Sequence, residues 1–218
     1  MNILALNTAF TDLGICLVKN DELVANYYSI CKKRSEQLIF KVLDDLLTNA
    51  KMHLSELDFY VVVKGPGSYT GLRIGMGVAK TFAQIYQKPV IGATSLELLA
   101  SMGKPTEQPF YAILNCTRTE IFHAQFQFQE YELKQLTEIH LTTLETFLER
   151  LENHPVILKR TVNLPNPSSN SLFEQLRRMP LQYPVADAYP LLQAGKKIYR
   201  QCNGNFSIVN PIYIKKEV

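Results

Sequence analysis

The chain has 218 residues, 46% hydrophobic and 20% charged, so it can bury a core without disulfides or metal and suits one large domain or two small lobes. A net charge of +3 without a clustered basic face argues against a dedicated nucleic-acid binder. The opening MNILALNTAF has no basic segment and its apolar run breaks at Asn7, which argues against a signal peptide or a membrane span. Its four cysteines are scattered, as in proteins of a reducing compartment, so we expect a cytoplasmic protein.

The first half of the chain predicts three strands, a helix, a strand and a second helix, followed by a short strand and a short helix. Apolar residues recur at helical spacing in both long helices, and Pro89 ends the second. The run DFYVVVK is almost entirely apolar, as in a strand covered on both faces. Thr94 and Glu97 have capping-box spacing at a helix start. The expected strands are 2–8, 13–19, 23–30, 58–64 and 89–93, and the expected helices are 35–51, 70–86 and one beginning at 94.

The segment Gly103–Pro109 is rich in turn-forming residues and marks a boundary, after which the pattern begins again. Thr142 and Glu145 repeat the capping-box spacing and predict a helix that ends at Leu151. The expected strands of this half are 110–115, 119–128, 133–141 and 155–159, and the expected helices are 142–151, 171–178 and 187–201.

Both halves can therefore be interpreted as strand, strand, strand, helix, strand, helix. This order predicts an α/β fold of two lobes, 1–102 and 103–218, of the actin, hexokinase and Hsp70 (ASKHA) kind, with duplicated βββαβα lobes. The helix at 187–201 and the tail after it could pack back on the first lobe. Folds of this kind usually place a nucleotide between the lobes, so an ATP-dependent enzyme is one hypothesis.

The segment KGPGSYTGLRIG, Lys64–Gly75, places a glycine-rich turn before a helix, where anions often bind. The Walker A motif fails because no lysine follows at the required spacing from Gly65 or Gly67. The dinucleotide fingerprint fails because Thr70 stands where it needs glycine. A tight turn made by Gly65, Pro66 and Gly67 is the favoured interpretation, with a phosphate site and a contact surface as alternatives.

Small residues form one stripe along the helix after this loop: Gly71, Gly75, Ala79 and Ala83. A glycine inside a helix costs about 1 kcal/mol relative to alanine, so we expect another backbone to approach this stripe closely. That backbone could belong to the protein's own sheet or to a partner. The preceding helix has an apolar arc of about 200°, wider than one core requires. Two adjacent helices of this type favour an interface with another chain.

No catalytic constellation is evident from the residues. Asn7 and Asn115 follow the first strand of each lobe, where a Mg²⁺-binding carboxylate would be expected, and asparagine carries no charge. Asp12 lies in a turn-like segment, Ser68 lacks the G-x-S-x-G elbow, and Cys116 has no general base near it in sequence. The histidines and cysteines show no zinc-binding spacing, so no metal site is expected.

Several segments resemble the bacterial TsaB (YeaZ) family. KGPGSYTGLRIG resembles the family's GPGSFTGLRIG signature, ILALNTA its opening ILAIDTA, and KRSEQL its HSEQL. The segments PVIGATSLELLA and NPIYIKK also match. The resemblance covers the first half well and the second half thinly. Three residues depart from the family pattern, namely Asn7 and Asn115, where aspartate is usual, and Arg34, where histidine is usual.

This resemblance implies a non-catalytic paralogue of the transferase TsaD that acts in the synthesis of threonylcarbamoyladenosine in tRNA. It implies binding to TsaD through the two helices of the first lobe, recruitment of the ATPase TsaE, a homodimer through the same surface when alone, and contact with tRNA only through the complex. It implies no cofactor, with a nucleotide at a subunit interface left open. The predicted interface residues are Leu38, Ile39, Val42, Leu46, Thr70, Leu72, Arg73, Met76, Ala79, Lys80 and Ala83.

In this interpretation the loop of Gly65, Pro66, Gly67, Gly71 and Gly75 is structural, and it leads into a helix whose small stripe admits a partner helix. Two alternatives remain open. One is an ATP-dependent transferase, a kinase or a metalloprotease-like enzyme of the same fold. The other is a module that binds tRNA directly, which would need a basic stripe with stacking aromatic residues.

Overall fold

The computed structural model describes residues 1–10, 12–30, 35–103, 107–117, 119–130, 132–151, 156–158, 181–182, 188–202 and 208–214. The chain forms two compact units, Met1–Leu98 with Ala186–Tyr213, and Leu99–Val185 with Ile214–Val218. The division expected from sequence was 1–102 and 103–218. In the structure the first boundary follows Leu98, and the segment Ala186–Tyr213, for which packing back on the first lobe was considered, belongs to the first unit. Arg34 and the helix expected at 171–178 lie outside the described residues.

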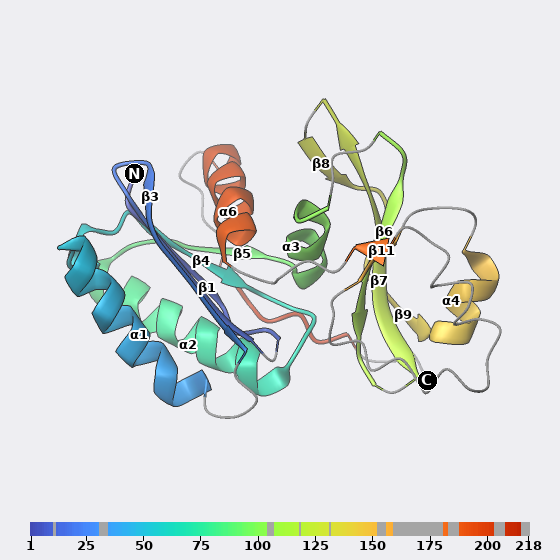
Figure 1. Ribbon diagram of the computed structural model, residues 1–218, viewed down its shortest axis with the longest axis horizontal. Coiled ribbons are helices and arrows are strands. Elements are labelled where there is room, and N and C mark those ends of the chain that lie inside the picture. Colours follow the sequence, from blue (N-terminus) through green and yellow to red (C-terminus); the bar gives the residue numbers. More distant parts are fainter. Residues whose placement is uncertain are drawn as a thin grey trace. The chain divides into compact units, whose positions relative to one another are not determined.

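The first unit is built on a five-stranded mixed sheet in the order β3-β2-β1-β4-β5 (Figure 1). The first three strands form an antiparallel meander, and β1, β4 and β5 run parallel. Asn20 and Asp21 join β2 to β3 with φ of 52° and 68°, the conformation of a two-residue hairpin turn. The strands are β1 (Ile3–Asn7), β2 (Asp12–Lys19), β3 (Glu22–Ile30), β4 (Phe59–Val63) and β5 (Val90–Ala93).

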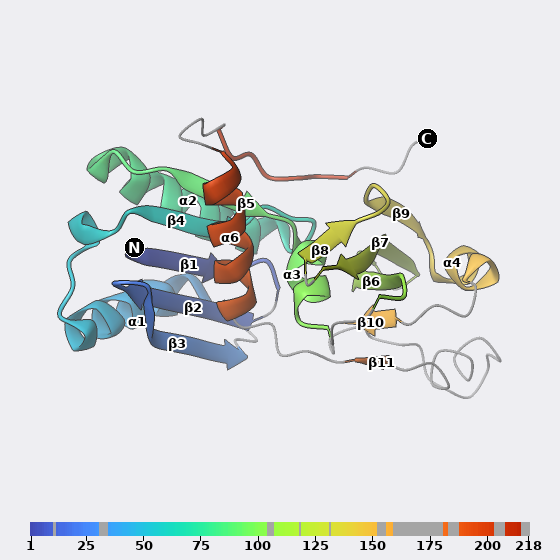
Figure 2. The same cartoon turned by 90° about the horizontal axis from the view of Figure 1, so that it is seen from above.

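Helices cover both faces of this sheet (Figure 1). Helices α1 (Ser35–Ala50) and α2 (Tyr69–Tyr86) lie on one face, and α6 (Tyr189–Gln201) crosses the strands on the other, as Figure 2 shows. All five residues of β4 are buried, which confirms the prediction of a strand covered on both sides. Gly195 of α6 lies directly against Val61 of β4, where a Cβ would overlap the valine side chain. The last helix of the chain therefore completes the first core.

Side chains define the ends of several helices in this unit. The Lys19 ammonium donates to the carbonyl oxygens of Ala50 and Lys51, where the dipole of α1 favours a cation. Thr94 and Glu97 form the predicted capping box, with reciprocal hydrogen bonds of 2.6 and 3.0 Å between side chain and backbone. Two short helices complete the unit, the 3-10 helix η1 (Leu54–Glu56) and α3 (Ser95–Ser101), where the boundary between the units falls.

The second unit repeats this topology with a sheet in the order β11-β10-β6-β7-β8. Strand β6 pairs antiparallel with β7 and parallel with β10, as β1 pairs with β2 and β4. The elements are β6 (Phe110–Asn115), β7 (Glu120–Gln129), β8 (Glu132–Gln135), β9 (His140–Thr143), α4 (Leu144–Arg150), β10 (Val156–Leu158) and β11 (Leu181–Gln182).

Two expectations for this unit need correction. The strand expected at 133–141 is two short strands, because the Gln125 amide donates to the Thr137 hydroxyl rather than to a backbone carbonyl and the ladder is interrupted there. Strand β8 pairs with one end of β7 and β9 with the other. The helix expected to be capped by Thr142 is capped by Thr143, whose hydroxyl accepts from the Thr146 amide.

Acid should weaken this unit through His123. Burial, and secondarily the neighbouring His140, lower the pKa of His123 from 6.5 to about 4. The folded state therefore binds fewer protons than the unfolded state between these values, so stability is complete above pH 6.5 and is lost as the pH falls toward 4. We expect His123→Phe, which keeps an aromatic ring against Phe147, to lose less stability than the parent between pH 7 and pH 4.5 in urea titrations. Equal losses in both proteins would contradict this assignment.

A candidate partner-binding face and its glycine loop

The glycine loop is held on both sides by backbone hydrogen bonds. The Ser95 amide donates to the Gly65 carbonyl at 2.9 Å, and the Ser68 amide donates to the Ala9 carbonyl at 2.8 Å. From the C-terminal segment, the Ile212 amide donates to the carbonyl of Lys64 at 2.7 Å. Gly65 has φ of +108°, and a Cβ there would lie 2.8 Å from the Ile212 oxygen. Glycine is required at this position by backbone conformation and by space.

The small stripe of α2 faces the protein's own β1–β2 turn. A Cβ on Gly71 would overlap the carbonyl oxygen of Thr8, and a Cβ on Gly75 would overlap the Thr8 hydroxyl. That hydroxyl donates to the Gly71 carbonyl at 2.7 Å, and a Cβ on Gly67 would lie 2.6 Å from the Ala9 oxygen. The expectation that this stripe admits a partner helix is therefore wrong. The close approach that offsets the cost of glycine is made within the chain.

Most of the apolar residues predicted for the interface lie in the core of the first unit, because they also face inward. These residues lie on the side of α1 and α2 that faces the sheet. Helical spacing shows that they share one side of each helix, but it does not show whether the sheet or a partner covers that side. Six predicted interface residues are at most 8% exposed and pack in the first unit's core: Ile39, Val42, Leu72, Met76, Ala79 and Ala83.

The other predicted interface residues lie nearer the surface. Thr70 and Arg73 are exposed on α2, and Lys80 is half-buried. Leu38 and Leu46 of α1 are half-buried and pack against the edge of the core. These five residues are the part of the predicted interface that a partner could reach.

The exposed side of the two helices carries features that sequence reasoning missed. Gly77 is exposed in mid-helix, and a Cβ there would meet no atom within 4 Å. At 100° per residue it lies between Thr70 and Thr81 along one line. Ile85 at one end of α2 is 63% exposed, and Phe40 of α1 is 57% exposed. We call Phe40, Thr70, Gly77, Thr81 and Ile85 the outer face.

The N-terminus of α2 is occupied by the protein itself. The Ser68 hydroxyl accepts from the Gly71 amide at 3.2 Å and caps the helix. Together with the bond from Ser68 to Ala9, this cap uses amide groups that an anion would need. An aromatic stack lies beside it, with the Arg73 guanidinium 4.5 Å from the Tyr69 ring centre and the Tyr213 ring 5.2 Å from Tyr69. The contact between Tyr69 and Tyr213 holds the C-terminal segment against α2.

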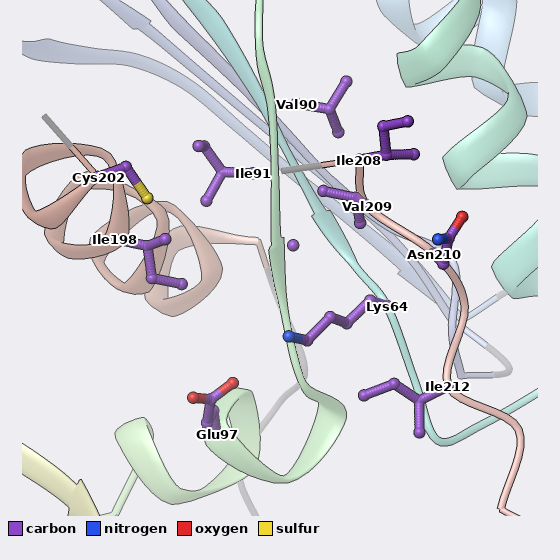
Figure 3. A pocket seen from close by; sticks show the side chains of 11 residues that line it. Lys64, Val90, Ile91, Glu97, Ile198, Cys202, Ile208, Val209, Asn210 and Ile212 are labelled. Carbon is purple, nitrogen blue, oxygen red and sulfur yellow. The ribbon is translucent and has the colours of Figure 1, made fainter. Parts of the chain in front are cut away.

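A cavity of about 400 Å³ lies between β5, α6 and the C-terminal segment, next to Lys64 (Figure 3). Figure 3 shows the Lys64 ammonium and the Glu97 carboxylate reaching toward one another, with Ile91, Ile198 and Val209 as apolar walls. Among the described residues that line the cavity, one positive side chain, Lys64, is balanced by one negative side chain, Glu97. It does not resemble a triphosphate site, which needs several amide or cationic donors.

Two of the positions considered for catalysis, Asn7 and Ser68, make structural hydrogen bonds. Asn7 is fully buried, and its side-chain oxygen accepts from the Ala9 amide at 3.2 Å. Burial, and secondarily Glu120, raise the pKa of the Cys116 thiol, which disfavours the thiolate form. Within the described ranges, no three side chains of His, Cys, Asp or Glu gather closely enough to hold a metal ion. The same ranges contain no helix long and apolar enough to cross a membrane.

Comparison with known proteins yields a consistent set of relatives. A family model described as "TsaD: tRNA N6-adenosine threonylcarbamoyltransferase" matches residues 27–194. The tRNA threonylcarbamoyladenosine biosynthesis protein TsaB of Bacillus subtilis is 33% identical over 159 residues, which cover 72% of this chain and 69% of that protein. The Escherichia coli protein of the same name is 30% identical over 60% of this chain and 57% of its own length.

A solved structure described as YeaZ from Pseudomonas aeruginosa matches with a TM-score of 0.79 at 20% identity, over 98% of this chain and 99% of that chain. At this identity the likeness concerns the fold. It confirms the predicted fold class, a two-lobed α/β fold of the ASKHA kind.

Proposed function

Because the chain belongs to the TsaB (YeaZ) family, we propose that it is a non-catalytic subunit in the synthesis of threonylcarbamoyladenosine in tRNA, and that it acts by binding the transferase TsaD. The relatives' names support the pathway. The observation that carries the proposed mode of action is the outer face, because it combines exposed apolar side chains with a helical glycine that no contact among the described residues explains.

The outer face suits a partner helix. Phe40 and Ile85 are large apolar side chains, each more than half exposed, and such residues commonly mark protein–protein contacts. Gly77 costs the isolated helix about 1 kcal/mol relative to alanine, and a partner backbone packed against it would offset that cost. Thr70 and Thr81 are also short, so a second helix can approach along the whole line.

Membership of the family supports the remaining assignments, which are also proposals. TsaD occupies the outer face in the active complex, and a second copy of the chain occupies it when TsaD is absent. The ATPase TsaE joins the TsaD complex, and tRNA is bound through that complex rather than by this chain. We assign no cofactor to the isolated chain, and a nucleotide, if one is bound, lies at the subunit interface. The scattered cysteines and a tRNA-modifying role support a cytoplasmic location.

Co-purification with the cognate TsaD, followed by a threonylcarbamoyl-transfer assay with and without this chain, tests the proposal. We expect a stable complex, transfer that depends on the chain, and no transfer by the chain alone. A chain that forms no complex but binds or hydrolyses Mg·ATP by itself would instead be an enzyme of the same fold. Binding of tRNA by the isolated chain that weakens steeply with salt would indicate a direct tRNA-binding module.

A further inference from the structure

The second unit contains a cavity of about 270 Å³ between its sheet and α4. Aromatic rings form part of the wall, since Tyr111 packs edge-on against Phe147 with ring centres 5.2 Å apart, and His123 lies 4.8 Å from Phe147. Three threonines contribute hydroxyl groups to the lining: Thr137, Thr142 and Thr146. The cavity therefore combines flat apolar walls with hydrogen-bonding groups, as small-molecule sites do.

Two histidines meet on one wall of this cavity. His123 of β7 and His140 of β9 are direct cross-strand partners, so their side chains lie on the same face of the sheet, with ring centres 5.6 Å apart. Both ring nitrogens of His123 are buried, and neither has a hydrogen-bond partner among the residues that the structure describes. A buried imidazole normally satisfies both nitrogens, one as donor and one as acceptor. The two unpartnered nitrogens point to a polar ligand that the cavity binds.

The charges around the cavity select the sign of that group. Among the described residues that line it, Arg150 is positively charged near neutral pH, and there is no aspartate, glutamate or cysteine. No carboxylate lies within ion-pair distance of Arg150 in the described ranges. A metal cation would be repelled by the guanidinium and would find no carboxylate or thiolate ligand in the lining.

The threonine hydroxyl groups of the lining also favour a ligand that accepts hydrogen bonds. The Thr146 hydroxyl accepts from Thr143 at 2.8 Å, and the Thr137 hydroxyl accepts from the Gln125 amide at 2.9 Å. Each therefore keeps its own proton for another acceptor. An oxyanion supplies several acceptor oxygens and suits the planar donor fork of arginine.

We propose that the cavity between β7, β9 and α4 binds a small oxyanion, a phosphate or a carboxylate, held by Arg150, the two cross-strand histidines and the hydroxyl groups of Thr137 and Thr146. The site lies wholly within the second unit and does not depend on the binding of TsaD.

The test is an NMR titration of the histidine side chains in the full-length chain, with sodium phosphate and sodium benzoate added separately against sodium chloride of equal ionic strength. We expect saturable shifts of the His123 and His140 ring signals with at least one of the two anions. A response to phosphate alone assigns a phosphate ligand. A response to benzoate alone assigns a carboxylate on a flat group, which the aromatic walls would accept.

Arg150→Gln should weaken binding at least tenfold, because it removes the charged donor from an exposed position without altering the core. Lys134→Gln is the matched control, since it removes one positive charge from an exposed site on β8 outside the cavity lining, and it should leave binding unchanged. The absence of saturable shifts would overturn the proposal, as would equal losses in both variants. Shifts that appear only with zinc chloride would overturn it too, because they would indicate a cation site.

Discussion

Replacing Gly71 with alanine should destabilise the monomer severely, whereas the same replacement at Gly77 should stabilise it. The added methyl group at Gly71 would overlap the carbonyl oxygen of Thr8, which belongs to the backbone at the end of β1 and cannot rotate away. Overpacking of this kind typically costs about 1–3 kcal/mol, and the hydrogen bond from the Thr8 hydroxyl to Gly71 contributes about 1 kcal/mol more. We therefore expect a loss of about 2–4 kcal/mol.

Gly77→Ala provides the matched comparison because it makes the same chemical change on the same helix. Its Cβ meets nothing within 4 Å, so only helix propensity changes, and stability should rise by about 1 kcal/mol. For a chain of this size the thermal midpoint should fall by about 4–16 °C in Gly71→Ala and rise by about 2–4 °C in Gly77→Ala. A Gly71→Ala protein as stable as the parent would show that α2 does not pack against Thr8 as described.

Gly77→Gln should strongly weaken association through the outer face while the monomer becomes more stable. Glutamine is a good helix former, so an exposed replacement gains most of the approximately 1 kcal/mol that glycine costs. Its side chain would prevent a partner helix from approaching along Thr70 and Thr81. Central interface residues commonly contribute about 2–4 kcal/mol, so we expect the affinity for TsaD to fall by about 30-fold to 1000-fold.

Titration calorimetry with TsaD, together with thermal unfolding of the variant alone, separates the two effects. Ile85→Glu should also weaken binding without loss of fold, since Ile85 is 63% exposed. Arg200→Gln is the control, because this residue is exposed on α6, on the opposite face of the same sheet. Unchanged affinity in both Gly77→Gln and Ile85→Glu would exclude the outer face as the TsaD site. Substitutions at Gly75 or Ala79 cannot serve this purpose, because both positions pack in the core.

The glycine signature acquires a physical explanation that does not involve a phosphate. Gly65 makes the turn, while Gly67 and Gly71 leave room for the backbone of the β1–β2 turn, which lies against the start of α2. The Ser68 side chain then caps the helix. The signature is therefore a device for close packing of backbones, and it positions α2 so that its opposite side presents Gly77 to solvent.

The sequence by itself determined the features that depend on neighbouring residues. The Thr94–Glu97 capping box requires two side chains three positions apart, and both hydrogen bonds are present. The apolar run of β4 correctly indicated a strand covered on both faces, because every position of a doubly covered strand is apolar. The order of elements in the first half followed from the same local patterns.

Only the tertiary structure decided which side of each helix meets the sheet. Helical periodicity places Gly71 and Gly75 on one face and Gly77 on another, but it does not show which face lies against Thr8. That choice depends on contacts between residues more than 60 positions apart, such as the bond from Thr8 to Gly71. The packing of α6 on β4 is equally non-local, since Gly195 meets Val61 across most of the chain. Local spacing carries no information about such contacts, and they decide which residues remain available to a partner.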